Sequence, residues 1–112
     1  MTIQELIDRL AERPVDFSDV MAVIDAEYDF TPSAFQNGEQ HNAAGSNNGS
    51  CKIFAFAALN QLSKEATLNA FGDYYSKDVL GNPSGEDHAN IRNFMRSGWA
   101  GIRFEDSALI SK

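Results

Sequence analysis

The segment CKIFAFAALNQL, residues 51–62, constrains the fold more than any other part of the chain. Nine of its twelve residues are apolar, and only Lys52, Asn60 and Gln61 are polar. A helix that is apolar almost all round has to be buried on every side. Ser50, directly before the segment, is a residue type that caps helix N-termini. The sequence therefore predicts a buried central helix over about residues 51–62, with other elements packed around it.

Four further helices are indicated by capping residues and apolar periods. Each begins at a Ser, Thr or Asp and continues with apolar residues three or four positions apart. In the first of them, Thr2 and Glu5 have the spacing of a capping box. Pro14 then closes that helix, because the residue before a proline is pushed out of helical geometry. The four predicted ranges are about 2–13, 16–28, 63–79 and 84–98.

Two short segments are predicted to be extended. Residues 29–35 lose the helical period, and Pro32 limits them to an edge strand or a loop. Residues 101–105 alternate between apolar and polar side chains, so we expect them to pair with the first segment. The predicted fold is thus mainly α, with about five helices around the central one and a minor two-stranded β-element. The length of 112 residues predicts a single domain, residues 1–112.

Residues 36–50, QNGEQHNAAGSNNGS, contain three glycines and four asparagines without an apolar period. This composition predicts a long loop, and loops of about 15 residues in compact domains are usually functional or mobile. We therefore expect the binding surface of the protein here and on the polar residues beside it. The candidate binding residues are Glu39, Gln40, His41, Asn42, Asn47, Asn48, Lys52 and Arg92.

The charge balance restricts the partners. Sixteen acidic and nine basic residues give a formal net charge of −7, which argues against nucleic acid or an anionic membrane as the main partner. A protein partner is the expectation that remains, and the composition leaves the oligomeric state open. The whole imbalance falls in residues 1–39, which form either a solvated acidic face or a docking face for a basic partner.

Cys51 is the only cysteine, which excludes an internal disulfide and a multi-cysteine metal site. It stands at the start of the predicted central helix, where unpaired amides and the helix dipole lower the pKa of a thiol. Free cysteines are also among the most buried residues in proteins. Two interpretations follow: Cys51 is a buried core residue, or it is a nucleophile activated by His41 or His88 in a small cysteine-dependent enzyme.

The spacing of residues suggests two kinds of ligand site, a metal site and an anion site. Glu39 and His41 share one face if their stretch is extended, and with His88 they would supply three metal ligands. The chain has no HExxH or Cys/His spacing motif, so no metal or other cofactor is predicted. The glycines of residues 45–52 precede a helix and a lysine but lack the Walker pattern, which leaves only a simple anion on the helix amides.

Three motifs occur in order along the chain: NGEQHNAAG at residues 37–45, GSCK at 49–52 and GWAG at 98–101. With them, residues 28–104 resemble the HopJ type III effector family. The resemblance implies a bacterial protein that acts in the cytoplasm or, as the family name indicates, is exported to a host cell by type III secretion. It implies no catalytic residue and no substrate. We therefore expect a protein-interaction or effector-like module, with the Cys51 enzyme as the alternative.

Overall fold

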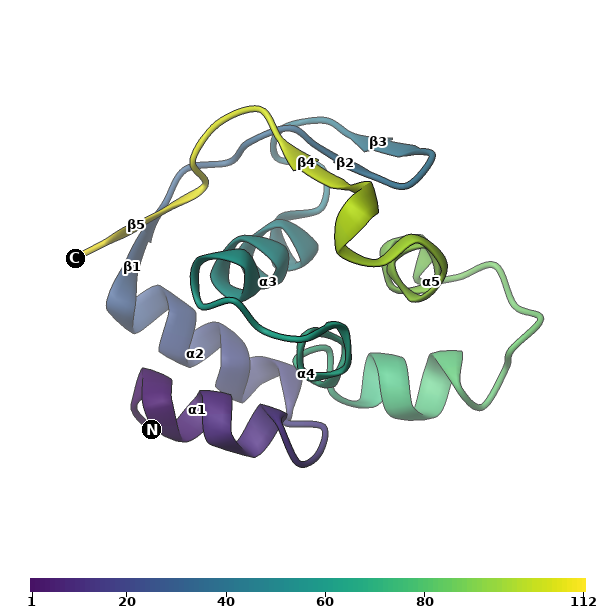
Figure 1. Cartoon of the computed structure of the whole chain (residues 1–112), viewed down its shortest axis with the longest axis horizontal. Coiled ribbons are helices and arrows are strands. Elements are labelled where there is room, and N and C mark those ends of the chain that lie inside the picture. The colour runs from purple at the N-terminus through teal and green to yellow at the C-terminus, as the bar shows by residue number, and fades with distance from the viewer.

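The structure, a computed structural model, describes all 112 residues. It contains five α-helices, one π-helical segment, one 3₁₀ turn and five strands of three residues each (Figure 1). The helical elements are α1 (Ile3–Leu10), α2 (Phe17–Glu27), α3 (Asn48–Leu59), α4 (Lys64–Asn69), η1 (Tyr74–Val79), α5 (Ala89–Ser97) and η2 (Gly98–Gly101). The strands are β1 (Tyr28–Phe30), β2 (Phe35–Asn37), β3 (Gln40–Asn42), β4 (Ile102–Phe104) and β5 (Leu109–Ser111).

The strands form two small antiparallel sheets. One sheet pairs β1 with β5, and the other has the strand order β3-β2-β4. Strands β2 and β3 make a hairpin, while β4 pairs with β2 so that Phe35 lies opposite Phe104. The three-stranded sheet lies at the end of the molecule opposite α1 (Figure 1). Both sheets join the middle of the chain to its C-terminal part.

The predicted fold class is wrong, because the protein is a mixed α/β fold and not a helical bundle around one helix. The buried core has 24 residues, of which α3 supplies six. The others come from four α-helices, from η1, from three strands and from the segments that join them. Helix α3 ends at Leu59, whose side chain is exposed, and Leu62 lies beyond the helix. The two-stranded element predicted for residues 29–35 and 101–105 is replaced by five strands in two sheets.

The predicted loop over residues 36–50 is also wrong. Its first half is the β2–β3 hairpin, and Gly38 has the positive φ of 60° that the turn requires. Its last three residues are the first three of α3. Asn37 and Asn42 are fully buried, although the segment contains no apolar period. Three-residue strands are too short to show alternation, which is why composition alone indicated a loop.

The helix predicted over residues 63–79 is divided into two parts. Ser63 caps α4 as predicted, because its side chain accepts a hydrogen bond from the Ala66 amide. The helix then ends at Asn69, and Gly72 takes a φ of 60°. A side chain at Gly72 would place its Cβ 2.7 Å from the Val15 carbonyl oxygen, so the chain turns closely against the segment before α2. The turn leads into η1, which starts at Tyr74.

The predicted capping box of the first helix is confirmed. The Thr2 hydroxyl accepts a hydrogen bond from the Glu5 amide, and the Glu5 carboxylate accepts one from the Thr2 amide. Asp16 caps α2 through the Ser18 amide, also as predicted. The longest helix, α3, has 12 residues, and none of the helices has the length and hydrophobicity of a membrane span.

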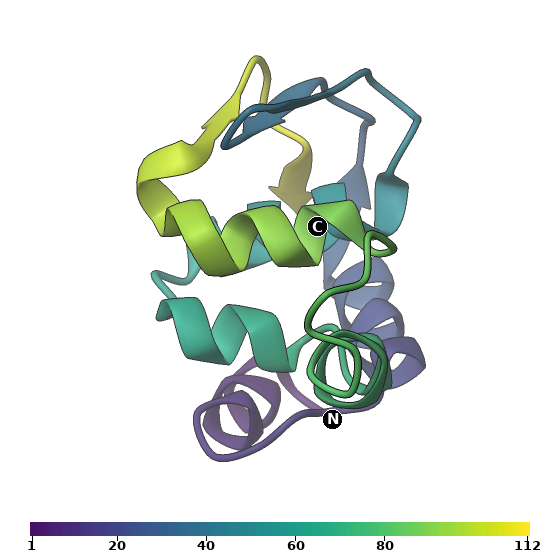
Figure 2. The same cartoon turned by 90° about the vertical axis from the view of Figure 1, so that its right-hand side faces the viewer.

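The arrangement of α3, η1 and α5 positions the site described below. Helix α5 runs beside α4, and its first turn lies on the same side of the molecule as the start of α3 and as η1 (Figure 2). The segment between η1 and α5 contains the turn residues Asn82 and Pro83 and leads to His88, which has a φ of 52°. Residues other than glycine rarely take a positive φ, so contacts around His88 must hold this conformation.

Candidate functional site

Cys51 lies in the core and not at an exposed helix start. Helix α3 begins three residues earlier than predicted, so the Cys51 amide already donates a hydrogen bond to the Asn47 carbonyl oxygen. The thiol is 2% exposed and donates to the Ser33 carbonyl oxygen at 3.6 Å. Burial raises the pKa of the Cys51 thiol, which opposes formation of the reactive thiolate. The Cys51 thiol is therefore not activated as a nucleophile.

The two histidines are not partners of Cys51. His41 is exposed on β3, opposite Gln36, and makes no hydrogen bond through its ring. The ring of His88 bonds to Asp78, with Nε2 3.2 Å from Oδ2. No three residues of the types His, Cys, Asp and Glu lie close enough together to hold a metal ion. Glu39, His41 and His88 thus do not form the ligand set that their spacing suggested.

Two of the candidate binding residues with positive charge are engaged inside the protein. Lys52 forms an ion pair with Asp25 of α2 at 2.8 Å, and its ammonium lies 4.9 Å from the centre of the Phe30 ring. Arg92 is buried and donates hydrogen bonds to the carbonyl oxygens of Asn82, Pro83 and Asp87. These contacts join elements of the fold, and Arg92 also lines a cavity of about 260 Å³ together with Val79 of η1 and Met95 of α5.

Asn42 belongs to a buried cluster of asparagines that holds the hairpin against the start of α5, and the exposed Asn47 joins this cluster to the start of α3. Asn42 and Asn90 exchange hydrogen bonds, with each Nδ2 donating to the other's Oδ1 at 3.1 Å and 3.0 Å. Asn37 donates to the carbonyl oxygen and the Oδ1 of Asn90, and Asn47 donates to Asn42. The cluster fixes the β2–β3 hairpin against the first turn of α5. The Oδ1 of Asn37 is the one buried side-chain atom without a partner.

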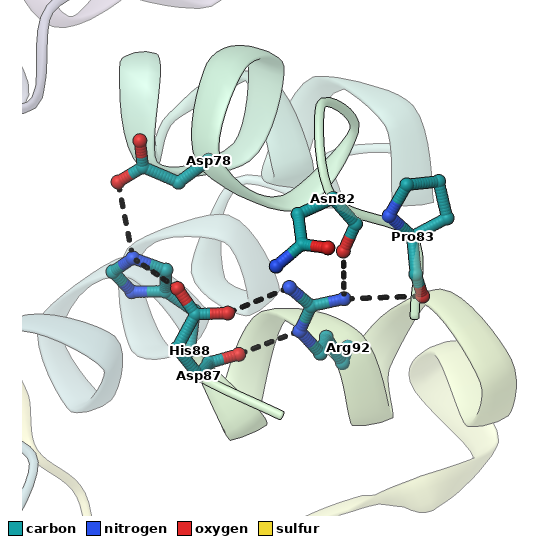
Figure 3. A network of polar contacts seen from close by, with 6 residues as sticks. All are labelled: Asp78, Asn82, Pro83, Asp87, His88 and Arg92. Carbon is teal, nitrogen blue, oxygen red and sulfur yellow. Dashed lines mark hydrogen bonds and ion pairs between the residues drawn. The ribbon is translucent and has the colours of Figure 1, made fainter. Parts of the chain in front are cut away.

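A second polar network holds His88 and the segment before α5 (Figure 3). Arg92 donates to a carboxylate oxygen of Asp87 at 2.7 Å, and this hydrogen bond lowers the pKa of Asp87. Nε2 of His88 lies 3.2 Å from Asp78 and 3.8 Å from Asp87. In Figure 3 the second ring nitrogen of His88 points away from both carboxylates. The network explains how His88 keeps its left-handed backbone, since side chains on both flanks hold the ring.

The largest cavity, of about 500 Å³, lies where these elements meet. Its polar side chains come from β3 and from the residues at the starts of α3 and α5: Gln40, Asn47, Ser50, His88 and Asn90. Its apolar side chains come from the start of α2, from the chain after α4, from η1 and from α5: Phe17, Phe71, Tyr74, Ala89 and Ile91. Among the candidate residues from sequence, Gln40, His88 and Asn47 line this cavity. An apolar cavity with a few polar groups is the usual form of a binding site.

Sequence reasoning missed the aromatic wall of the cavity. The rings of Phe17 and Tyr74 meet edge-to-face at 5.2 Å, and Tyr74 lies 5.2 Å from the His88 ring. The helix predicted over residues 63–79 did not indicate that Tyr74 faces Phe17 and His88. The π-helical turn of η1 changes the angle between successive side chains, so a period of 3.6 does not apply there. Gly72 was the available signal, because a glycine inside a helical pattern indicates a break.

The fold is a small mixed α/β domain whose largest cavity is lined by the starts of α2, α3 and α5, by β3, by Phe71 and by η1. The model of the HopJ type III effector protein family matches residues 3–109, and the chain belongs to that family. The crystal structure of the unknown function protein VPA0580 is similar over 100% of this chain and 95% of that one, at 57% identity and a TM-score of 0.96. No curated protein matches.

Proposed function

We propose that the protein is an effector-type interaction module that binds a partner protein at the cavity between η1 and the starts of α3 and α5. The observation that carries the proposal is the cavity itself, which combines aromatic side chains with polar groups, of which the hydroxyls of Ser50 and Tyr74 have no partner inside the protein. Membership of a family described as type III effectors supports this class of function. A role through Cys51 has no comparable support, because that thiol is buried against Ser33.

The cavity is suited to a protein partner because of how it is built. It is open to solvent, and its wall contains Tyr74, which is 43% exposed. The hydroxyl groups of Ser50 and Tyr74 make no hydrogen bond within the protein, so both are free to bond to a partner. Interfaces concentrate their binding energy in a few side chains that fill such pockets.

Site-directed photocrosslinking tests the proposal. Ala89 lines the cavity and is exposed, so a photoreactive phenylalanine analogue in its place reports what enters the cavity. Ala26 is exposed on α2 outside the cavity and serves as the matched control position. We expect crosslinked species in bacterial or host lysate from position 89 that do not form from position 26.

Competition makes the test specific to the cavity. About a tenfold excess of unlabelled protein should remove the crosslinks from position 89, whereas the Ala89→Trp variant, which fills the cavity, should not. The Ala26→Trp variant should compete as well as the unmodified chain. Identical crosslinks from both positions, or full competition by Ala89→Trp, would contradict binding at the cavity.

A further inference from the structure

The cavity excludes charge to an unusual degree for this chain. The protein has 25 residues of the types Asp, Glu, Lys and Arg, from 16 acidic and 9 basic positions, and none of them lines the cavity. A lysine or arginine of a partner would find no carboxylate there as an ion-pair partner. The charged groups are nearby but turned elsewhere, since Asp78 and Asp87 face Nε2 of His88.

A neighbouring hollow shows what a site for a cation would contain. It has a volume of about 250 Å³, shares Phe17 and Tyr74 with the cavity, and is lined by Asp16 and Asp73. The edge-to-face pair of Phe17 and Tyr74 thus separates an acidic hollow from an uncharged one. An acidic side chain is also disfavoured in the cavity, because the net charge of −7 repels it and no lysine or arginine lines the walls to pair with it.

The shape of the apolar wall favours a flat group. Phe17, Tyr74 and His88 form a row of three rings with successive centroids 5.2 Å apart. Phe71 and Ile91 add apolar surface to the same cavity. Aromatic rings pack on one another at centroid distances of about 4.5–7 Å, either offset or edge-to-face. A planar ring from a partner would therefore find the contacts that it makes in protein cores.

His88 adds one directional polar group to this wall. A carboxylate accepts hydrogen bonds and does not donate them, so the bond between Asp78 and His88 requires a proton on Nε2. In the neutral imidazole, Nδ1 then carries a lone pair, and Nδ1 has no hydrogen-bond partner within the protein. Because Asp78 fixes this tautomer and His88 lines the cavity, Nδ1 is the ring atom left to accept a hydrogen bond from an entering N–H or O–H group.

We propose that the cavity receives a neutral aromatic side chain that carries its own donor, a tryptophan or tyrosine of the partner protein. The ring lies against Phe17 and Tyr74, and its N–H or O–H donates to Nδ1 of His88. This inference rests on the proposed function and names the chemistry by which the partner is recognised. Tryptophan and tyrosine are also the residues that most often dominate interface energies.

The anchor is tested with small probes on the full-length protein labelled with ¹⁵N. N-acetyl-tryptophanamide is titrated beside its 1-methyl derivative, which has the same ring without the N–H donor. We expect saturable shifts of the Gly49, Ser50, Ala89, Asn90 and Ile91 amide signals, with affinity about tenfold weaker for the methylated probe. The N-acetyl amides of lysine and glutamate should produce no saturable shifts at these positions.

Two variants separate recognition by His88 from a structural effect. His88→Asn keeps a residue type that tolerates a positive φ but removes the ring acceptor, so the two tryptophan probes should bind this variant equally. His41→Asn changes the exposed histidine and should preserve the tenfold difference. Equal binding of both probes to the unmodified protein, saturable binding of the lysine or glutamate probes, or no binding of any probe would overturn the proposal.

Failure of this inference differs from failure of the proposed function. If crosslinking at position 89 is specific but the tryptophan probe does not bind, the cavity binds a partner through another chemistry. If the probe binds as expected but crosslinking is unspecific, the cavity binds an aromatic group. The proposal that a partner protein binds there is then contradicted.

Discussion

Two regions meet at the start of α5, the asparagine cluster and the cavity, and they differ in whether their polar groups are hydrogen-bonded within the protein. In the asparagine cluster, Asn90 bonds to both Asn37 and Asn42, and nearly every buried amide atom has a partner. In the adjacent cavity, the hydroxyls of Ser50 and Tyr74 and Nδ1 of His88 have none. Buried polar groups that are fully paired specify a structure, whereas unpaired groups in an open cavity remain available to a ligand. The comparison separates the residues that build this site from those that use it.

The largest effect is expected for Asn90→Ala. This change removes every hydrogen bond that the Asn90 side chain makes to Asn37 and Asn42. Nδ2 of Asn37 then keeps only its bond to the residue 90 backbone carbonyl, and Nδ2 of Asn42 keeps only a bond of 3.4 Å to the Phe35 carbonyl. We expect the free energy of unfolding in urea to fall by about 3 kcal/mol. Asn48→Ala is the matched control, because Asn48 is exposed and its side chain makes no hydrogen bond, and it should change stability by less than about 0.5 kcal/mol. Equal losses in both variants would show that the cluster is not structural.

A smaller loss is expected for Gly72→Ala, which disturbs the turn that presents Tyr74. The new Cβ would lie 2.7 Å from the Val15 carbonyl oxygen on a backbone with a φ of 60°. We expect thermal or urea unfolding to show a loss of about 2 kcal/mol. Gly45→Ala has a positive φ without any atom within 4 Å, so it should cost about 1 kcal/mol from the backbone alone. Equal losses would mean that the collision with Val15 is relieved.

The loss of stability caused by Asp87→Asn is expected to depend on pH. The hydrogen bond from Arg92 lowers the pKa of Asp87 in the folded protein, so the folded state binds fewer protons at this site than the unfolded state. The stabilisation is present above the ordinary carboxyl pKa and is lost as the pH falls through the lowered value. The stability gap between the original chain and the variant should therefore narrow from about pH 6 to about pH 2.5 in urea titrations. A stability difference that stays constant with pH would contradict the lowered pKa of Asp87 in the folded protein.

The smallest effect on stability is expected for Ser50→Ala in the cavity. The Ser50 hydroxyl has no partner within the protein, so its removal should change the free energy of unfolding by less than about 0.5 kcal/mol. Ser63→Ala removes a hydroxyl that accepts a hydrogen bond from the Ala66 amide, and its loss should cost about 1 kcal/mol. If both variants lose the same free energy of unfolding in urea, the hydrogen bond of Ser63 does not distinguish it from Ser50.

Three of the predicted helix caps are confirmed, whereas the caps predicted at Ser50 and Ser84 are wrong, because α3 begins after Asn47 and α5 after His88. The capping box of Thr2 and Glu5 and the caps at Asp16 and Ser63 depend on neighbours within three positions, so the sequence displays them directly. The binding candidates Gln40 and Asn47, and His88, a candidate metal ligand or base, line the largest cavity. Lys52 and Arg92 were singled out by the same reasoning, and the fold uses their charges internally. Composition indicates polar residues but does not indicate which of them acquire partners.

The family, the caps at Thr2, Asp16 and Ser63, and the apolar segment of α3 follow from the sequence alone, because each depends on residue identity over a short range. The remaining features depend on how distant parts of the chain pack together. The pairing of β1 with β5, the asparagine cluster and the aromatic wall of the cavity each bring together residues more than 40 positions apart, such as Phe30 with Leu109, Asn37 with Asn90 and Phe17 with Tyr74. Pairing between such distant residues is selected by the packing of the whole core, and no local pattern encodes it.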